Sequence, residues 1–208
     1  MRIDEILRLA PVMPVITIED AAKAVPLARA LVAGGLRVIE VTLRTAGALE
    51  AIAAIAKEVP ECVLGVGTVL SERDLHAAAR AGATFAVSPG ATPALLDAAS
   101  PGPLPLLPAI ATASELMAAM ERGFSAFKFF PAAYVGGTAA LSALAGPFPA
   151  ARFCPTGGID VASAPAWLAL SNVLCVGGSW VTPKDALASG DFERIERLAK
   201  EAAALGKS

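Results

Sequence analysis

The sequence lacks several residue types, and each scarcity excludes a class of protein. It has one histidine, His76, so a metal site built from several histidines is excluded. Its three cysteines are an odd number, and each lies in or beside an apolar run, which indicates reduced, buried side chains and no disulfide framework. The formal net charge is −2, only 17% of residues are charged, and no basic cluster is present. Nucleic acid is therefore not expected as a partner.

Apolar segments long enough to span a membrane are also missing, although 55% of the residues are hydrophobic. Four charged residues between Met1 and Pro11 interrupt the stretch where a signal peptide would have its apolar core. We therefore expect a cytoplasmic protein with no membrane partner. The 208 residues are enough for one domain with a large core.

Strand-like apolar runs alternate with Ala-, Leu- and Glu-rich helical stretches along the chain, without a linker. Eight such alternations predict a parallel sheet covered by helices, and the number eight favours closure into a (β/α)8 TIM barrel. Residues 1–208 would form this single domain, with a short N-terminal helix over Arg2–Leu9. The expected strands are Val12–Ile18, Val38–Thr42, Val63–Thr68, Thr84–Ser88, Leu104–Pro108, Ala126–Phe129, Arg152–Thr156 and Asn172–Gly177.

Glycines mark several of the junctions between helices and strands. Gly35, Gly82 and Gly123 each come shortly before an expected strand, where a left-handed residue commonly ends a helix. The alternative fold is an open doubly wound sheet. Such a sheet would ordinarily have a glycine-rich turn after the first strand, and Thr17–Ala22 contains no glycine.

Polar residues at the ends of the expected strands are the candidates for chemistry. In a barrel of this type the active site lies at the carboxyl ends of the strands, while residues in mid-strand fill the core. The strand ends should therefore bring one group of residues to a single mouth. This group comprises Glu40, Arg44, Thr68, Ser88–Gly90, Lys128, Thr156–Gly158 and Gly177–Ser179.

Lys128 is the most unusual member, because it stands between phenylalanines in an expected buried strand. An ordinary lysine side chain, with a pKa near 10.4, is protonated at neutral pH and is a poor nucleophile. Burial in an apolar pocket lowers the pKa of an amine and frees its lone pair to attack a ketone. Lys128 is therefore the candidate for a Schiff-base residue. Alternatively, it extends to the barrel end or only pairs with Glu40.

Glu40 and Arg44 add an acid and a cation to the same mouth. Glu40 lies among Val and Ile residues, and a buried carboxyl group suits the proton transfers of Schiff-base chemistry. Arg44 offers a planar fork for a substrate carboxylate. Thr68 and the backbone carbonyl of Pro89 could complete a pocket around a keto acid. The alternatives are a structural ion pair for Glu40 and an ordinary loop position for Arg44.

Two groups of glycines predict a phosphate site. Gly157–Gly158 and Gly177–Ser179 fall on the loops after the expected seventh and eighth strands. Backbone N–H groups of these loops commonly bind phosphate in such barrels. The alternative is that the glycines only form tight turns.

The same residues lie in segments that resemble the 2-keto-3-deoxy-6-phosphogluconate (KDPG) and 4-hydroxy-2-oxoglutarate (KHG) aldolase family. The main signatures are Gly35–Arg44 (GLRVIEVTLR) and Gly123–Gly136 (GFSAFKFFPAAYVG). The resemblance covers almost the whole chain in order. It continues through Val66–Leu70, Ser88–Gly90, Arg152–Ile159 and Leu174–Trp180.

The resemblance implies a homotrimeric enzyme without metal or cofactor whose partner is a small molecule, a phosphorylated keto-deoxy sugar acid. It would split KDPG into pyruvate and glyceraldehyde 3-phosphate, the cleavage step of the Entner–Doudoroff pathway. Lys128 matches the Schiff-base lysine of the family and Glu40 its proton-transfer residue. The resemblance also assigns Arg44, Thr68 and Pro89 to pyruvate, Phe130 and Thr156 to the pocket wall, and Gly157, Gly158, Gly178 and Ser179 to the phosphate.

Several other functions stay open at this point. An aldolase for the galactonate isomer of KDPG or for 4-hydroxy-2-oxoglutarate would use the same residues. A metal-dependent aldolase would stabilise an enolate with a divalent ion, which a single histidine disfavours. A phosphosugar isomerase, an indole-forming synthase or a non-catalytic sugar-phosphate binder would keep the phosphate glycines without a reactive Lys128.

Overall fold

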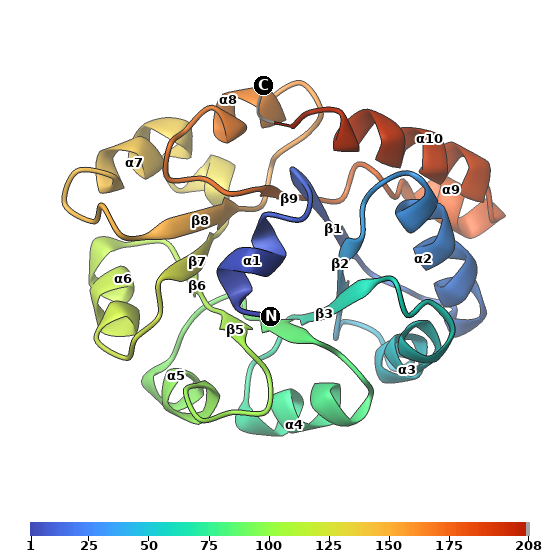
Figure 1. The fold of residues 1–208 in the computed structure, drawn as a ribbon, viewed down its shortest axis with the longest axis horizontal. Coiled ribbons are helices and arrows are strands. Elements are labelled where there is room, and N and C mark those ends of the chain that lie inside the picture. Colours follow the sequence, from blue (N-terminus) through green and yellow to red (C-terminus); the bar gives the residue numbers. More distant parts are fainter. Residues whose placement is uncertain (207–208) are drawn as a thin grey trace.

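The computed structural model describes residues 1–206 of the chain. Parallel strands curl around the centre of the molecule, and helices cover their outer side (Figure 1). The parallel α/β arrangement expected from the alternating pattern is therefore confirmed. The strands are β1 (Val12–Ile16), β2 (Val38–Thr42), β3 (Val63–Gly67), β4 (Phe85–Val87), β5 (Leu106–Leu107), β6 (Ala109–Ile110), β7 (Ala126–Phe129), β8 (Arg152–Pro155) and β9 (Val176–Gly178).

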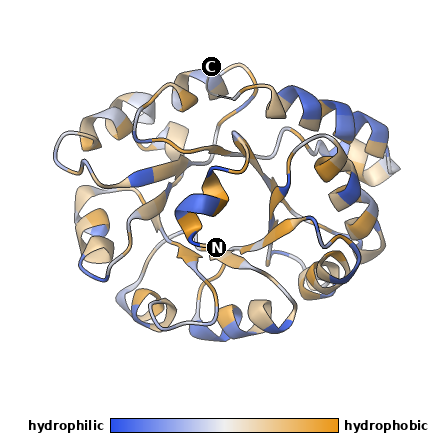
Figure 2. Ribbon diagram, in the orientation of Figure 1, coloured by the Kyte–Doolittle hydropathy of each residue, from blue (hydrophilic) through white to orange (hydrophobic). Residues whose placement is uncertain are grey.

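Most of the helices connect one strand to the next, and they turn their charged residues outward, most clearly on α10 in Figure 2. Within residues 1–206, every helix is too short or too polar to span a bilayer. The helices are α1 (Ile3–Leu7), α2 (Ala24–Ala33), α3 (Ala48–Glu58), α4 (Glu72–Arg80), α5 (Pro93–Ala99), α6 (Ala113–Met120), α7 (Gly137–Leu144), α8 (Ala164–Leu168), α9 (Lys184–Ser189) and α10 (Phe192–Ala203), with the 3-10 turns η1 (Ala21–Lys23) and η2 (Ala132–Tyr134).

Within residues 1–206, the strands form two hydrogen-bonded sheets and not the single eight-stranded sheet that the sequence predicts. Six strands pair in the order β5-β4-β3-β2-β1-β9, and three pair in the order β6-β7-β8. The expected strand Leu104–Pro108 is found as β5 and β6, on either side of Pro108. Proline has no N–H to donate, so it interrupts strand pairing. Between β8 and β9, an isolated bridge of Thr156 with Gly177 replaces a continuous ladder.

Side chains on the strands alternate between an inner and an outer cluster, as strand geometry requires. On β4, Phe85 and Val87 belong to the inner cluster, whereas Ala86 packs in the outer cluster that includes helix residues. Helix α1 covers one end of the inner cluster with Ile6 and Leu7, and Figure 1 shows it lying across the ends of the strands. The opposite end, where the strands have their carboxyl termini, is the end left for a site.

The helix ends confirm the expected role of three glycines. Gly35, Gly82 and Gly123 have φ angles of +93°, +95° and +85°, in the left-handed region that glycine adopts without strain. The sequence did not predict α9, because its six residues are too few for a helical period to be recognised.

Candidate active site

Lys128 and Glu40 meet between the two sheets. Glu40 is the third residue of β2 and Lys128 the third residue of β7. Lys128 Nζ lies 3.3 Å from Oε1 and 3.4 Å from Oε2 of Glu40. Their side chains are 5% and 1% exposed, respectively. Two charged groups this deeply buried are tolerated only because each is the other's partner.

Phe130 connects this pair to a cavity. Lys128 Nζ lies 5.3 Å from the centroid of the Phe130 ring, within the range of a cation–π contact. Phe130 is half-buried and also lines a cavity of about 870 Å³ at the carboxyl ends of the strands. A molecule in this cavity therefore contacts the aromatic ring that covers the amine.

Glu40 has room for its carboxylate because residue 67, on the neighbouring strand β3, is glycine. A Cβ atom at Gly67 would stand 2.8 Å from Cδ of Glu40 and would overlap Oε1. The missing side chain thus forms the space in which the carboxylate faces Lys128. The clash would involve the end of a flexible side chain, so a substitution here should move Glu40 without breaking the backbone.

We expect Gly67→Ala to lower the rate of the reaction at this site by about a hundredfold, since a misplacement of about 1 Å in a reacting group has effects of this order. Steady-state assays of product release measure the rate, and thermal melts report any loss of stability. Gly146→Ala is the matched control, because a Cβ atom at Gly146 meets nothing within 4 Å. Wild-type activity in Gly67→Ala would contradict the proposed role of the Glu40 position.

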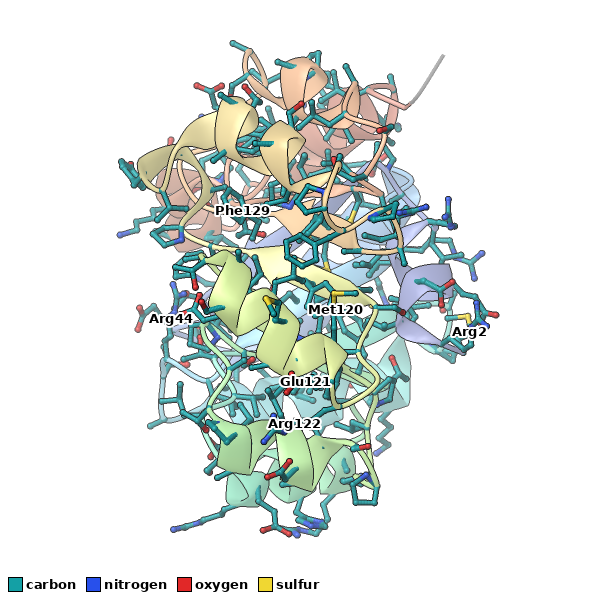
Figure 3. The ribbon with its side chains drawn as sticks, turned by 90° about the vertical axis from the view of Figure 1, so that its left-hand side faces the viewer. Arg2, Arg44, Met120, Glu121, Arg122 and Phe129 are labelled. Atoms are coloured by element: carbon teal, nitrogen blue, oxygen red, sulfur yellow. The ribbon has the colours of Figure 1, made fainter. Side chains whose placement is uncertain are left out.

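Arg44 and Thr68 lie together at the same mouth. Arg44 Nε donates a hydrogen bond of 3.2 Å to Thr68 Oγ1, which leaves the terminal nitrogens of the guanidinium group able to bind a carboxylate. Thr68 has a φ of +61°, a left-handed conformation that costs a non-glycine residue about 1–3 kcal/mol. Figure 3 shows Arg44 on the opposite side of the molecule from Arg2, which precedes α1.

The cavity gathers most, but not all, of the residues predicted from the strand ends. Four predicted site residues lie outside its lining: Glu40 and Lys128, which the Phe130 ring separates from it, and Thr68 and Pro89. Thr68 can act on a ligand in the cavity through Arg44. The predicted residues in the lining are Arg44, Phe130, Thr156, Gly157, Gly158, Gly178 and Ser179.

The loop after β8 presents its N–H groups to the cavity. The carbonyl oxygens of Thr156 and Gly157 accept hydrogen bonds of 2.8 and 3.0 Å from the N–H groups of Ala132 and Ala133. A trans peptide holds its C=O and N–H on opposite sides, so the N–H groups of Gly157 and Gly158 point the other way. Both residues line the cavity. This arrangement can bind an anion such as phosphate.

Gly177 and Gly178, the last two residues of β9, have packing roles of their own. A Cβ atom at Gly178 would overlap the ring of Trp180, and one at Gly177 would overlap Thr156 Oγ1. The small residue at 178 is therefore required by the indole, whether or not an anion binds beside it. Ser179 follows it on the cavity lining and supplies both a hydroxyl and an N–H group.

The cysteines and the histidine contribute nothing to the lining. All three cysteines are free and buried, as predicted, and His76 is exposed on α4. Burial raises the pKa of the Cys62 thiol to about 12. The pKa of the Cys175 thiol is raised mainly by its hydrogen bond with Cys154 and also by burial. Thiols in this state are poor nucleophiles at neutral pH. Within residues 1–206, no cluster of three or more His, Cys, Asp or Glu side chains is arranged to hold a metal ion.

The chain matches the family model described as KDPG and KHG aldolase over residues 3–198. It is also 57% identical, over 199 residues, to the KHG/KDPG aldolase of Escherichia coli (strain K12), with 96% of this chain and 93% of that protein covered. The chain belongs to the KDPG and KHG aldolase family. The resemblance inferred from the two signature segments is therefore confirmed.

Solved structures of KDPG aldolases have the same fold as this member of the family. The KDPG aldolase of Legionella pneumophila, with pyruvate captured at low pH as a covalent carbinolamine intermediate, has a TM-score of 0.96 and 42% identity, with 98% of each chain covered. The enzyme of Zymomonas mobilis ATCC 29191 has a TM-score of 0.95 and 51% identity, with 100% of this chain and 99% of that chain covered.

Several polar residues of the cavity in this family member were missed from the sequence, among them Asp20, Lys23 and Lys184. Two threonines were missed as well. Thr17 and Thr182 both line it. Thr17 follows β1, but the expected strand Val12–Ile18 placed it in a strand interior. Its polar side chain near the end of an apolar run could have identified it as a candidate for the site. Thr182 lies in the loop after β9, where nothing in the sequence distinguished it from other loop residues.

Proposed function

We propose that this chain is a Schiff-base (class I) aldolase that cleaves KDPG to pyruvate and glyceraldehyde 3-phosphate, the cleavage step of the Entner–Doudoroff pathway. The observation that carries the proposal is the buried Lys128 amine, 3.3 Å from the Glu40 carboxylate and in contact with a ring that lines the cavity. Membership of the family supports it. The carbinolamine captured in the Legionella pneumophila enzyme supports a covalent bond between an amine and pyruvate.

The first half of the reaction makes the electron sink. Lys128 Nζ gives a proton to Glu40 and attacks C2 of the keto acid, so that an N–C bond forms as the ketone π bond breaks. Glu40 gives its proton to the ketone oxygen, and the nitrogen then gives a second proton to Glu40. The resulting carbinolamine loses water, again with a proton supplied by Glu40, and becomes an iminium ion. Glu40 can serve these transfers because its two oxygens lie at nearly equal distances from the nitrogen.

The second half breaks the carbon–carbon bond. The C4 hydroxyl gives its proton to the Glu40 carboxylate, its oxygen becomes the aldehyde carbonyl, and the C3–C4 electron pair moves toward the iminium nitrogen. Glyceraldehyde 3-phosphate leaves, and an enamine is left on Lys128. The protonated Glu40 gives this proton to C3 of the enamine, which restores the iminium, and water then releases pyruvate and the free amine.

The remaining residues of the site hold the two charged ends of the substrate. Arg44 binds the C1 carboxylate with its terminal nitrogens, and the N–H groups of Gly157, Gly158 and Ser179 bind the phosphate at the other end. Thr68 fixes the guanidinium group of Arg44. Thr156 belongs to the wall between them. Pro89 follows β4, and a role in binding pyruvate rests on the family resemblance alone.

A substrate panel tests the proposal. With pyruvate release as the readout, we expect kcat/KM for KDPG to exceed that for 4-hydroxy-2-oxoglutarate by at least about tenfold, since only KDPG has a phosphate to bind in the glycine loops. The galactonate isomer is included in the panel. The rate should survive EDTA, because the iminium replaces a metal as the electron sink. A chelator-sensitive enzyme, or one without pyruvate release, would contradict the proposal.

We further infer that the two sheets close into one (β/α)8 barrel over residues 1–208, which form a single domain. Strands β5 and β6 belong to one segment interrupted at Pro108, and the bridge of Thr156 with Gly177 joins β8 to β9. The family resemblance also supports a cytoplasmic homotrimer. Light scattering of the purified protein would test the trimer.

A further inference from the structure

Thr17 and Thr42 form a hydrogen-bonded pair at the carboxyl ends of β1 and β2. Their hydroxyl oxygens are 3.0 Å apart, and Thr42 Oγ1 lies 3.0 Å from the carbonyl oxygen of Ile16. A carbonyl oxygen can only accept, so Thr42 donates its single proton to Ile16. Thr17 must then donate its own proton to Thr42. The Ile16 carbonyl thus fixes the direction of both hydrogen bonds.

Thr17 is the member of the pair that a ligand can reach. Thr42 is 0% exposed, whereas Thr17 is half-buried and lines the cavity together with Phe130 and Thr156. Because the Thr17 proton is directed at Thr42, its hydroxyl presents only lone pairs to the cavity. Thr17 therefore acts toward a ligand as a hydrogen-bond acceptor.

An acceptor in this place selects for a donor on the substrate. The carboxylate and the ketone of a keto-deoxy sugar acid only accept, so its donors are the hydroxyl groups on C4 and C5. The C4 hydroxyl gives up its proton in the reaction and belongs near Glu40, whose carboxylate faces Lys128. The C5 hydroxyl lies between the reacting carbon and the phosphate. Thr17 lines the same cavity as Thr156, Gly157 and Gly178, and its strand β1 pairs with β9 at Pro14 and Gly178.

We propose that Thr17 is a specificity-determining residue that accepts a hydrogen bond from the C5 hydroxyl of the substrate, which is the C2 hydroxyl of the aldehyde product. This inference rests on the proposed function and deepens it. A pocket that pairs a polar group with a substrate hydroxyl disfavours the analogue that lacks it, because the polar group is then left without a partner. The enzyme should therefore prefer the hydroxylated aldehyde to its deoxy analogue.

The reverse reaction, aldol addition of pyruvate, allows this to be measured with two aldehydes. These are glyceraldehyde 3-phosphate and 3-oxopropyl phosphate, which is the same molecule without the hydroxyl. Thr17→Val keeps the shape of the side chain and leaves the Thr42 bond to Ile16 in place. We expect kcat/KM for glyceraldehyde 3-phosphate to fall about tenfold, the size of one lost hydrogen bond, while that for the deoxy aldehyde changes less than about twofold.

Two further variants complete the design. Thr17→Ser retains the hydroxyl, so it should keep the preference for glyceraldehyde 3-phosphate that Thr17→Val loses. Thr84→Val removes a hydroxyl that donates 3.0 Å to the Leu64 carbonyl at the other end of the strands, and it should leave both aldehydes unaffected. An equal fall for both aldehydes in Thr17→Val, or no fall for either, would overturn the inference.

Exchange of the pyruvate methyl protons separates this inference from the function on which it rests. The exchange needs the Schiff base but no aldehyde. If the wild-type enzyme fails to exchange these protons, the proposed function itself is wrong. If it exchanges them but Thr17→Val lowers kcat/KM equally for both aldehydes, or for neither, only the role of Thr17 is wrong.

Discussion

Replacement of Lys128 by methionine is expected to lower cleavage of KDPG by at least about a thousandfold, because removal of a covalent nucleophile leaves only binding and polar contacts to act on the substrate. Methionine has a similar length and no charge, so it fits the buried position. Borohydride added with pyruvate should reduce the iminium and fix a stable adduct on Lys128 of the wild-type enzyme. Peptide mass spectrometry identifies the modified residue.

Stability has to be measured alongside activity in this variant. Lys128→Met leaves the Glu40 carboxylate buried without its partner, and breaking a buried ion pair on one side costs about 3–5 kcal/mol. The double variant Lys128→Met/Glu40→Gln removes both charges, so it should regain stability without regaining activity. Lys57→Met, on the exposed surface of α3, is the control for both measurements. An adduct at Lys23 or Lys184, or no adduct, would refute the assignment of Lys128.

Replacement of Glu40 by glutamine should slow exchange of the pyruvate methyl protons by about 10²–10⁴-fold, the usual contribution of a general acid–base group. Glutamine has the same shape as glutamate but cannot shuttle a proton. Binding of pyruvate should change far less, because in our mechanism Arg44 holds the carboxylate. Proton exchange followed by nuclear magnetic resonance gives the rate, and its dependence on pyruvate concentration gives the apparent affinity.

A matched substitution on the surface completes this experiment. Glu61→Gln changes the same functional group at an exposed position before β3, and its exchange rate should equal that of the wild type. If Glu40→Gln exchanged protons at the wild-type rate, Glu40 would have no part in the mechanism, and another proton carrier would have to be sought in the cavity.

The approach of Lys128 to Glu40 could be anticipated from the sequence, although the two residues are 88 positions apart. Parallel strands place their carboxyl ends at one edge, so two charged residues in apolar strand-like runs have few other places to meet. The sequence could not give their separation, because this depends on how far the strands curl. It also gave no reason for glycine at position 67, which becomes clear only when the Glu40 carboxylate occupies the space beside it.

Other features depend on contacts that no local pattern records. The direction of the Thr17 hydrogen bond is set by Thr42, which comes from the next strand, and by a backbone carbonyl. The break of the fifth strand follows from Pro108, whose position at the end of an apolar run suggested a terminus and not an interruption. Gly178 fitted a phosphate loop in the sequence, but the Trp180 ring gives it a second reason to be glycine.

The burial of Lys128 against Glu40 has a consequence for the course of the reaction. An ammonium ion and an iminium ion both carry one positive charge on the same nitrogen, so the carboxylate faces a cation in the resting protein and again in the intermediate. The dipoles and contacts around the pair are therefore set before substrate arrives, and they need little reorganisation when the covalent bond forms. The surroundings of Lys128 in the folded protein therefore already suit the iminium ion that forms on it during the reaction.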